Sequence, residues 1–286
     1  MKILFMGTAA AEGVPALFCH CEQCRYAREH GGKEIRGRCG AMIDGKLKID
    51  FGPDSYSQML KYRLDYLPVQ ALLITHGHED HLTPTELGYR MEGFGHFPAD
   101  DIPLTVYGNE HVGNLVQPFL NPHLVYSRIR PFEKRSIDGY SVTALEAVHY
   151  IDPNSKRYPI ESADGKTFYR TEEALFYLIE KDGKSILYAH DTDEFTSRDM
   201  ELLAGRKINL ISMDCTNGTW DCEYYGHMGA NDNLRMREKL LANGAADEHT
   251  VFVANHFSHN GLVPYEEMQK RLPGFIISYD GLELNV

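Results

Sequence analysis

Three histidines and two carboxylates lie within six residues of this sequence, His76-Gly77-His78-Glu79-Asp80-His81. They follow directly after the uncharged run 71–75, whose length and aliphatic content predict a buried strand. A turn leaving such a strand can direct the first two histidines to one side and Asp80 and His81 to another. Imidazole and carboxylate groups at this density predict two adjacent metal ions. A polar turn with incidental histidines is the alternative interpretation.

Further ligands must come from elsewhere, because two ions need more protein groups than one turn supplies. His149 follows the strand-like run 142–148, Asp191 follows 185–190 and His256 follows 251–255. A strand end is a place where a scaffold fixes a ligand rigidly. For any one of these residues alone, capping a strand or helix would be an equally good explanation. Their shared context makes them candidate ligands.

A second cluster consists of Cys19, Cys21 and Cys24, at C-x-C-x2-C spacing. Six cysteines in a chain of this length do not indicate a disulfide scaffold, whereas this tight spacing suits thiolate ligation of zinc. His20 lies too close to its neighbours to complete such a site. The distant His259 is the candidate for the fourth ligand.

The elements that must position these residues alternate short apolar runs with tight turns. Asp44-Gly45, Asp182-Gly183 and Asp280-Gly281 each lie between two apolar runs and predict antiparallel hairpins. Start signals predict helices over residues 83–94, 197–204, 231–242 and 264–272. Strands predicted at 208–213 and 250–254 alternate with the later helices. Two mixed sheets with helices outside them are the expected assembly.

Composition sets further limits. At 286 residues with 43% hydrophobic content, the chain has the size of one large layered domain, which we expect to span residues 1–286. No run approaches the roughly 18 apolar residues of a transmembrane helix. The opening apolar segment is too short for a signal-peptide core, so we expect a cytoplasmic protein. Lys and Arg total 29 against 41 Asp and Glu, and the net charge of −12 argues against a nucleic-acid partner.

The H-x-H-x-D-H motif at a strand end resembles the signature of the metallo-β-lactamase superfamily. That resemblance implies an α/β (α+β) fold, the four-layer αββα sandwich, with its metals at one edge between the sheets. Asp50-Phe51-Gly52 resembles an early Asp-x-Gly segment that supports the site from beneath. The ligands that the resemblance implies for two divalent ions, Zn or Mn, are His76, His78 and His149 for one, Asp80, His81 and His256 for the other, and Asp191 as a bridge.

The cysteine cluster narrows the resemblance to the PhnP-like branch, which hydrolyses cyclic phosphodiesters. That branch implies a structural Zn subsite near residues 19–24, bound by Cys19, Cys21, Cys24 and His259. PqqB, a protein of PQQ biosynthesis, is similar at the cysteines, but we do not expect it to keep the complete catalytic ligand set.

His227 falls where the catalytic histidine of the PhnP-like branch does, ahead of a helix. We predict His227 and Asp80 as the catalytic residues. An unperturbed imidazole titrates near 6.5 and can donate a proton to a departing oxygen at neutral pH. The alternative for His227 is a cap of the helix that follows it.

The predicted function is therefore that of a dinuclear metal-dependent phosphodiesterase acting on a small cyclic or nucleotide phosphodiester. The alternatives are a lactonase or thioesterase, a tRNA-processing nuclease, which the net charge opposes, and a non-catalytic metal or ligand carrier. The expected partner is a small-molecule substrate, with no membrane and with a homodimer left open. Residues 150–172 are predicted to form an extra flap, whose Lys156, Arg157 and Arg170 we interpret as a solvated charged loop rather than a second phosphate site.

Overall fold

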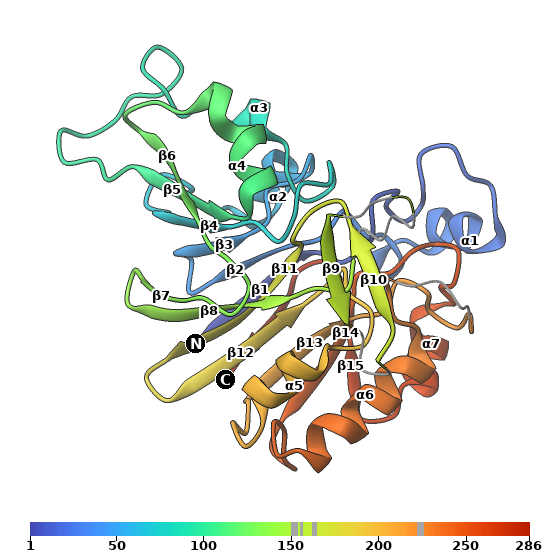
Figure 1. The fold of residues 1–286 in the computed structure, drawn as a ribbon. Helices are drawn as coiled ribbons and strands as arrows, with labels where there is room; N and C mark the ends of the chain where they lie inside the picture. The colour runs from blue at the N-terminus through green and yellow to red at the C-terminus, as the bar shows by residue number, and fades with distance from the viewer. Residues whose placement is uncertain (150–153, 155–156, 162–164, 222–225) are drawn as a thin grey trace.

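Two seven-stranded mixed sheets face each other, and helices cover the outer face of each (Figure 1). This computed structural model describes residues 1–149, 154, 157–161, 165–221 and 226–286. In spatial order, the strands of the first sheet are β16 (Leu282–Asn285), β1 (Lys2–Gly7), β2 (Gly40–Ile43), β3 (Leu47–Ile49), β4 (Ala71–Leu73), β5 (Leu104–Gly108) and β6 (Leu124–Arg128).

The second sheet is built mainly from the later half of the chain, and a separate hairpin accompanies it. In spatial order its strands are β15 (Phe275–Ile277), β14 (Val251–Asn255), β13 (Leu210–Asp214), β12 (Lys184–Ala189), β11 (Leu175–Lys181), β8 (Tyr140–Glu146) and β7 (Lys134–Ile137). The hairpin pairs β9 (Tyr158–Glu161) with β10 (Thr167–Arg170).

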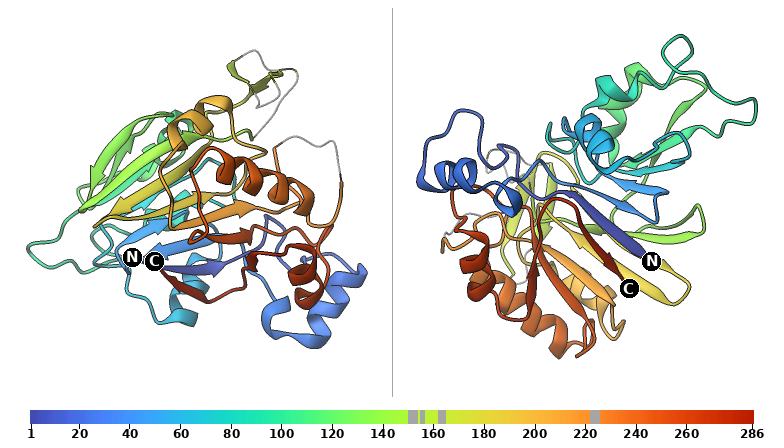
Figure 2. Two further views of the ribbon diagram at one scale, coloured as in Figure 1. Left: turned by 90° about the horizontal axis from the view of Figure 1, so that it is seen from below. Right: turned by 180° about the vertical axis from the view of Figure 1, so that it is seen from behind.

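The helices divide between the two outer faces (Figures 1 and 2). The first sheet is covered by α2 (Ser55–Tyr62), α3 (Pro84–Leu87) and α4 (Glu110–Val116). The second is covered by α5 (Ser197–Leu203), α6 (Ala230–Ala242) and α7 (Tyr265–Arg271), while α1 (Glu22–His30) follows the cysteine-bearing loop. Short 3-10 turns occupy Gly32–Glu34 and Gln117–Phe119. None of the described helices combines the length and the apolar character needed to cross a membrane.

Strand β11 illustrates why the sequence folds into layers. Its side chains alternate between two cores, since successive residues of a strand point to opposite faces. Leu175, Tyr177 and Ile179 enter the core between the sheets, whereas Phe176 and Leu178 join the core beneath α5, α6 and α7. A strand buried on both faces is apolar throughout its buried part, as residues 175–179 are here, and the charged Glu180 and Lys181 follow where the burial decreases.

Two of the three predicted hairpins are confirmed, and one is wrong. Strands β2 and β3 pair across Asp44-Gly45, and β11 pairs with β12 across Asp182-Gly183. Strand β15 instead pairs with β14, while β16 pairs with β1, so the chain crosses between the sheets at Asp280-Gly281. Asp280, whose side chain is 8% exposed, fixes this crossing by accepting hydrogen bonds from the Thr8 hydroxyl (2.8 Å) and the Gly37 N–H (2.7 Å).

Three of the predicted helices agree with the structure to within a residue or two, but the prediction for residues 83–94 is too long. Helix α3 ends at Leu87, where Gly88 caps it, and a loop continues. The Arg90 guanidinium ties that loop to Asp101 and to the carbonyl of His123, both at 2.9 Å, which holds the loop in a non-helical path. Helices α1, α2 and α4 were not predicted.

The predicted flap falls partly outside the described residues, which exclude Lys156. Arg157 is exposed, in agreement with a charged loop. Arg170 contradicts that interpretation, because it is only 1% exposed. Its guanidinium donates to Glu146 Oε1 (2.7 Å) and to the Ala147 carbonyl (3.0 Å), so it anchors β10 to the end of β8.

Candidate metal centre

The predicted ligands gather where strands of both sheets end. Parallel pairing aligns β3, β4 and β5 in the first sheet and β12, β13 and β14 in the second, so the carboxyl ends within each set share an edge. His76 follows β4, His149 follows β8, Asp191 follows β12 and His256 follows β14. The ligands that were predicted from their positions at strand ends therefore lie in one spatial cluster.

Three imidazoles form the first group of this cluster. His78 Nδ1 lies 2.7 Å from His76 Nε2 and 3.2 Å from His149 Nε2. Burial lowers the pKa of His76 well below its ordinary value and that of His149 to about 3. These side chains are therefore neutral at physiological pH, which is the form in which imidazole binds a metal.

Asp80, His81 and His256 form the second group. His81 Nε2 lies 3.1 Å from Asp80 Oδ2 and 3.4 Å from His256 Nε2. Burial opposes ionisation of Asp80, but the adjacent His81 outweighs burial and lowers the pKa of Asp80 to about 2. The group thus combines an ionised carboxylate with two facing ring nitrogens.

Asp191 connects the two groups through its two oxygens. Its Oδ1 lies 3.5 Å from His149 Nε2, and its Oδ2 lies 2.8 Å from His81 Nε2 and 2.9 Å from His256 Nε2. Oδ2 is buried and accepts no hydrogen bond of normal geometry from the described residues. Asp191 and His256 also adopt left-handed backbone conformations (φ 50° and 60°), a strain that clusters at functional sites.

The outward nitrogens of four histidines are all occupied, which fixes the ring orientation. Each Nδ1 has an oxygen partner that accepts its proton, and the inward Nε2 then carries the lone pair. The partners are Thr75 Oγ1 for His76 (3.0 Å), Asp50 Oδ2 for His81 (2.7 Å), the Gly226 carbonyl for His149 (3.0 Å) and Thr216 Oγ1 for His256 (2.7 Å).

These inward nitrogens and carboxylate oxygens lie close enough to need positive charge among them. That charge is either a proton on His81 and His256, whose pKa is lowered by burial but raised further by the adjacent carboxylates, or bound metal ions. The donor set is mainly imidazole with two carboxylates, which suits Zn or Mn better than Mg. The described residues therefore fit a pair of divalent ions. The assignment of each ligand to one ion stays a prediction.

Asp214 and His227 lie directly beside this cluster. His227 Nδ1 lies 3.0 Å from Asp214 Oδ2 and 3.9 Å from Asp191 Oδ1. Asp214 is itself saturated, since Oδ1 accepts the N–H groups of Thr216 and Met228 and Oδ2 accepts the Asp191 N–H. Because both of its oxygens already accept hydrogen bonds, Asp214 serves to orient His227 rather than to bind a metal ion.

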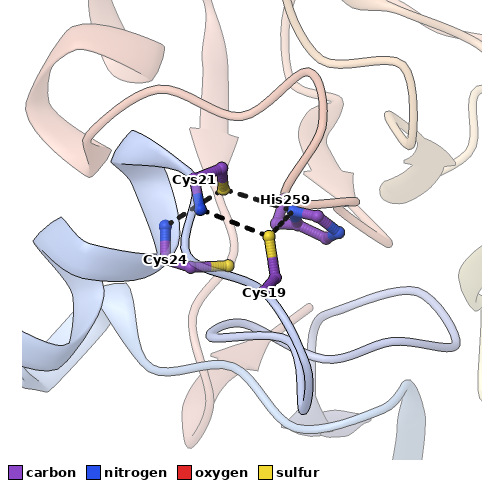
Figure 3. A group of neighbouring side chains, drawn as sticks. All are labelled: Cys19, Cys21, Cys24 and His259. Atoms are coloured by element: carbon purple, nitrogen blue, oxygen red, sulfur yellow. Dashed lines mark hydrogen bonds between the residues drawn. The ribbon is translucent and has the colours of Figure 1, made fainter.

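The three cysteines and His259 form a separate group, although His259 is far from the cysteines in the sequence (Figure 3). His259 Nδ1 lies 3.4 Å from Cys21 Sγ and 3.6 Å from Cys19 Sγ. Backbone N–H groups point at the sulfurs, from Cys21 to Cys19, from Cys24 to Cys21 and from Ala16 to Cys24, at 3.3 to 3.4 Å. Such N–H donors stabilise thiolates.

This group fits a tetrahedral zinc ion. The N–H of Cys21 lowers the pKa of the Cys19 thiol, whereas burial raises the pKa of Cys24 to about 11. Cys24 is therefore a thiol at neutral pH unless a cation lies beside it, and metal binding displaces that proton. Three sulfurs and one imidazole nitrogen are a common ligand set for structural zinc.

Replacing Cys21 by serine is expected to remove one zinc ion per chain and to lower the free energy of unfolding by about 2 kcal/mol or more, because zinc binding contributes directly to folding. The measurements are metal analysis and urea unfolding. His20→Ala is the matched control, since His20 is exposed in the same loop and should change neither quantity. Unchanged zinc content in Cys21→Ser would contradict the assignment.

Some contributors to the site were missed in the sequence. Glu172, only 2% exposed, accepts the Gly77 N–H with both oxygens (3.1 and 3.2 Å) and the Asn109 side-chain amide (2.7 Å). Asn109 follows β5, so the strand-end argument could have found it. Thr216 likewise follows β13 by two residues. Glu172 follows β10, whose residues Thr167–Arg170 are not an apolar run, so only the fold brings Glu172 to the ligands.

A known protein family matches most of this chain and accounts for its fold. The model of the beta-lactamase superfamily domain matches residues 47–277. The chain belongs to the metallo-β-lactamase superfamily. Membership in this superfamily supports a metal-dependent hydrolase in general, and the predicted αββα sandwich is confirmed.

Within the superfamily, relatives of two kinds align over the whole chain. Coenzyme PQQ synthesis protein B of Methylobacterium radiotolerans is 24% identical over 319 residues, which cover 100% of both chains. A diphosphatase of the PhnP family superposes with a TM-score of 0.73 at 21% identity, covering 100% of this chain and 97% of that one. Zn²⁺-bound PqqB of Methylobacterium extorquens gives 0.71 at 20% identity, covering 100% of both. At these identities the two structures establish the fold alone.

Proposed function

We propose that this protein is a metal-dependent phosphodiesterase that hydrolyses a small cyclic or nucleotide phosphodiester. The observation that carries the proposal is the Asp214–His227 pair beside the converging ligand groups. Hydrolysis of a phosphodiester expels an alkoxide-like oxygen, which needs a proton as its bond to phosphorus breaks. His227 supplies a proton donor next to the reacting centre.

Divalent ions bound at His76, His78, His149 and the neighbouring ligands would supply Lewis acidity and a water molecule of lowered pKa. His227 holds its Nδ1–H toward Asp214, and no described residue is hydrogen-bonded to Nε2 on the opposite side of the ring. When the oxygen of water replaces the leaving oxygen on phosphorus, Nε2–H transfers its proton to that departing oxygen. Asp214 keeps the ring oriented before and after the transfer, and the neutral imidazole that remains regains a proton from solvent before the next turnover.

The alternative functions differ in what they require of these residues. A lactonase or thioesterase would use the same ligands on a carbonyl carbon. A carrier has no need of a proton donor, and the net charge of −12 opposes a tRNA substrate. A step in the synthesis of coenzyme PQQ is a second candidate, favoured by the full-length alignment with the PQQ synthesis proteins.

A substrate panel with the metal-loaded protein tests the proposal. It comprises bis(p-nitrophenyl) phosphate, adenosine 2′,3′-cyclic phosphate, a dinucleotide joined by a diphosphate and a simple lactone, each assayed with Zn and with Mn. We expect cleavage of the phosphodiesters and no opening of the lactone. Lactone opening alone would move the protein to acyl chemistry, and a fully loaded protein without turnover would favour a carrier or a role in PQQ synthesis.

A further inference from the structure

The turn that carries the first two histidine ligands is held by a buried carboxylate from another part of the chain. Glu172 is 2% exposed and accepts the Gly77 N–H with both Oε1 (3.2 Å) and Oε2 (3.1 Å). Gly77 lies between His76 and His78, so its backbone position affects where both imidazoles point. The turn leaves β4 of the first sheet, whereas Glu172 precedes β11 of the second. This contact therefore joins the two sheets at the metal ligands.

Asn109 fixes the orientation of Glu172. Its side-chain NH2 donates to Glu172 Oε2 (2.7 Å) and to the Glu173 carbonyl (2.9 Å), and its Oδ1 accepts the Val112 N–H (2.9 Å) at the start of α4. Asn109 is 1% exposed. Both donors of this amide are used, and the cap on α4 determines which end of the amide faces Glu172.

Helix α4 also packs directly against the turn. A Cβ atom added at Gly77 would meet His111 Cδ2 at 2.4 Å and Leu115 Cδ1 at 3.0 Å, so two side chains of α4 already contact the backbone there. Because Asn109 caps the same helix, Gly77 is held by α4 and Glu172 together. A turn held in this way keeps its shape before an ion binds, which lowers the cost of ordering the ligands.

The charge of Glu172 is not balanced by a basic side chain. Its partners are the neutral N–H of Gly77 and the neutral amide of Asn109, and no described Lys or Arg residue pairs with it. A buried carboxylate without a counter-ion is costly unless cations lie nearby. Burial lowers the pKa of His78, and Glu172 is among the carboxylates that oppose this shift, so its charge acts on a ligand.

We propose that Glu172 is a positioning residue for the divalent ion predicted at the first ligand group. It fixes the turn through Gly77 and adds a negative charge that favours a cation. His81, a predicted ligand of the second ion, is instead held by Asp50 (2.7 Å), so the second ion should depend less on Glu172. The proposal rests on the metal pair of the proposed function and not on its substrate.

Replacing Glu172 by glutamine tests this role with almost no change in size. Both oxygen positions of Glu172 lie against the Gly77 N–H, so either placement of the amide points an NH2 at another donor. We expect the first ion to bind about 10-fold or more weakly, the effect typical of losing a partner that orients a ligand. The second ion and the cysteine zinc should keep their affinities. Competition with a graded chelator, followed by metal analysis, measures all three.

The absorption spectrum of the Co²⁺-substituted protein identifies which ion is affected. The bands that change in Glu172→Gln should be those that change in His78→Ala, and not those that change in Asp80→Ala. A purely structural defect would lower the melting temperature without selecting one ion.

Glu173→Gln is the matched control, because the adjacent Glu173 carboxylate faces Arg128 (3.4 Å) and should leave all three affinities unchanged. Combining Glu172→Gln with Asn109→Asp provides a rescue. The glutamine NH2 then has a carboxylate acceptor, the total charge equals that of the wild type, and an aspartate still caps α4. This double variant should recover part of the lost affinity.

Equal weakening of every ion in Glu172→Gln, or the same loss in Glu173→Gln, would overturn the proposal. A lower melting temperature with unchanged affinities would do so too. If Glu172→Gln does not fold, Glu172→Asp, which keeps the charge but withdraws it from Gly77, must still weaken the first ion selectively. A protein that binds both ions but cleaves no phosphodiester would reject the proposed function and leave the positioning role in place, whereas a first ligand group that takes up no ion would reject the role.

Discussion

Replacing Asp191 by asparagine is expected to empty at least one of the two catalytic ion positions and to reduce phosphodiester turnover by about 10³-fold or more. Asp191 directs one oxygen at each group of imidazoles, within 2.8 to 3.5 Å of three ring nitrogens. An amide offers one neutral oxygen in place of two charged ones, so both ions lose a charged ligand at once. Metal analysis after dialysis and kcat/KM on bis(p-nitrophenyl) phosphate measure the effect.

The Asp191→Asn variant distinguishes the two predicted metal centres. Zinc at the cysteine site should be retained, so the metal content is expected to fall from about three ions per chain toward one or two. Glu194→Gln is the control, because this nearby carboxylate pairs with surface Arg235 and Lys239 rather than with the ligands. A full metal complement in Asp191→Asn would show that Asp191 is not the bridge.

Replacing His227 by alanine is expected to lower kcat by about 100-fold or more on a substrate with an alkoxide leaving group, while metal content stays unchanged. The effect should be much smaller on bis(p-nitrophenyl) phosphate, since p-nitrophenolate departs readily without a proton. This contrast between substrates identifies a proton donor, because a purely structural defect would slow both substrates alike. Equal losses on both would therefore contradict the assigned role.

The pH profile gives a second readout of His227. Burial lowers its pKa, but the charges of Asp214 and Asp191 outweigh burial and raise the pKa to about 9. The donor must be protonated to act, so wild-type kcat should fall as the pH rises through this pKa and hold below it. Metal ions bound at the neighbouring ligands are expected to shift this fall in kcat toward lower pH, because like charges disfavour the imidazolium. The fall in kcat at high pH should be absent from the His227→Ala variant.

Much of the candidate site could be predicted from the sequence because its ligands stand at strand ends. His149, Asp191 and His256 each follow an apolar run that periodicity identifies, and β8, β12 and β14 form there. The cysteine spacing indicates a zinc site and the resemblance supports His259 as its fourth ligand, and the fold brings these four side chains together. Their roles as ligands stay predictions, to be tested by metal analysis.

What the sequence could not supply depends on packing between distant segments. The Asp280-Gly281 pair has the local pattern of a hairpin, yet β15 and β16 each find another partner, and Asp280 stabilises the crossing through Thr8 and Gly37. Arg170 was interpreted as a solvated charge because composition does not reveal the carboxylate of Glu146.

The cysteine site has a consequence for the unfolded chain. Cys19 and His259 are 240 positions apart in the sequence, near opposite ends of the protein. An unfolded chain rarely holds ligands so far apart together, so the complete ligand set for zinc exists only in the folded protein. Zinc bound there would therefore tie together segments from nearly the two ends of this sequence, and release of the ion is expected to accompany global unfolding.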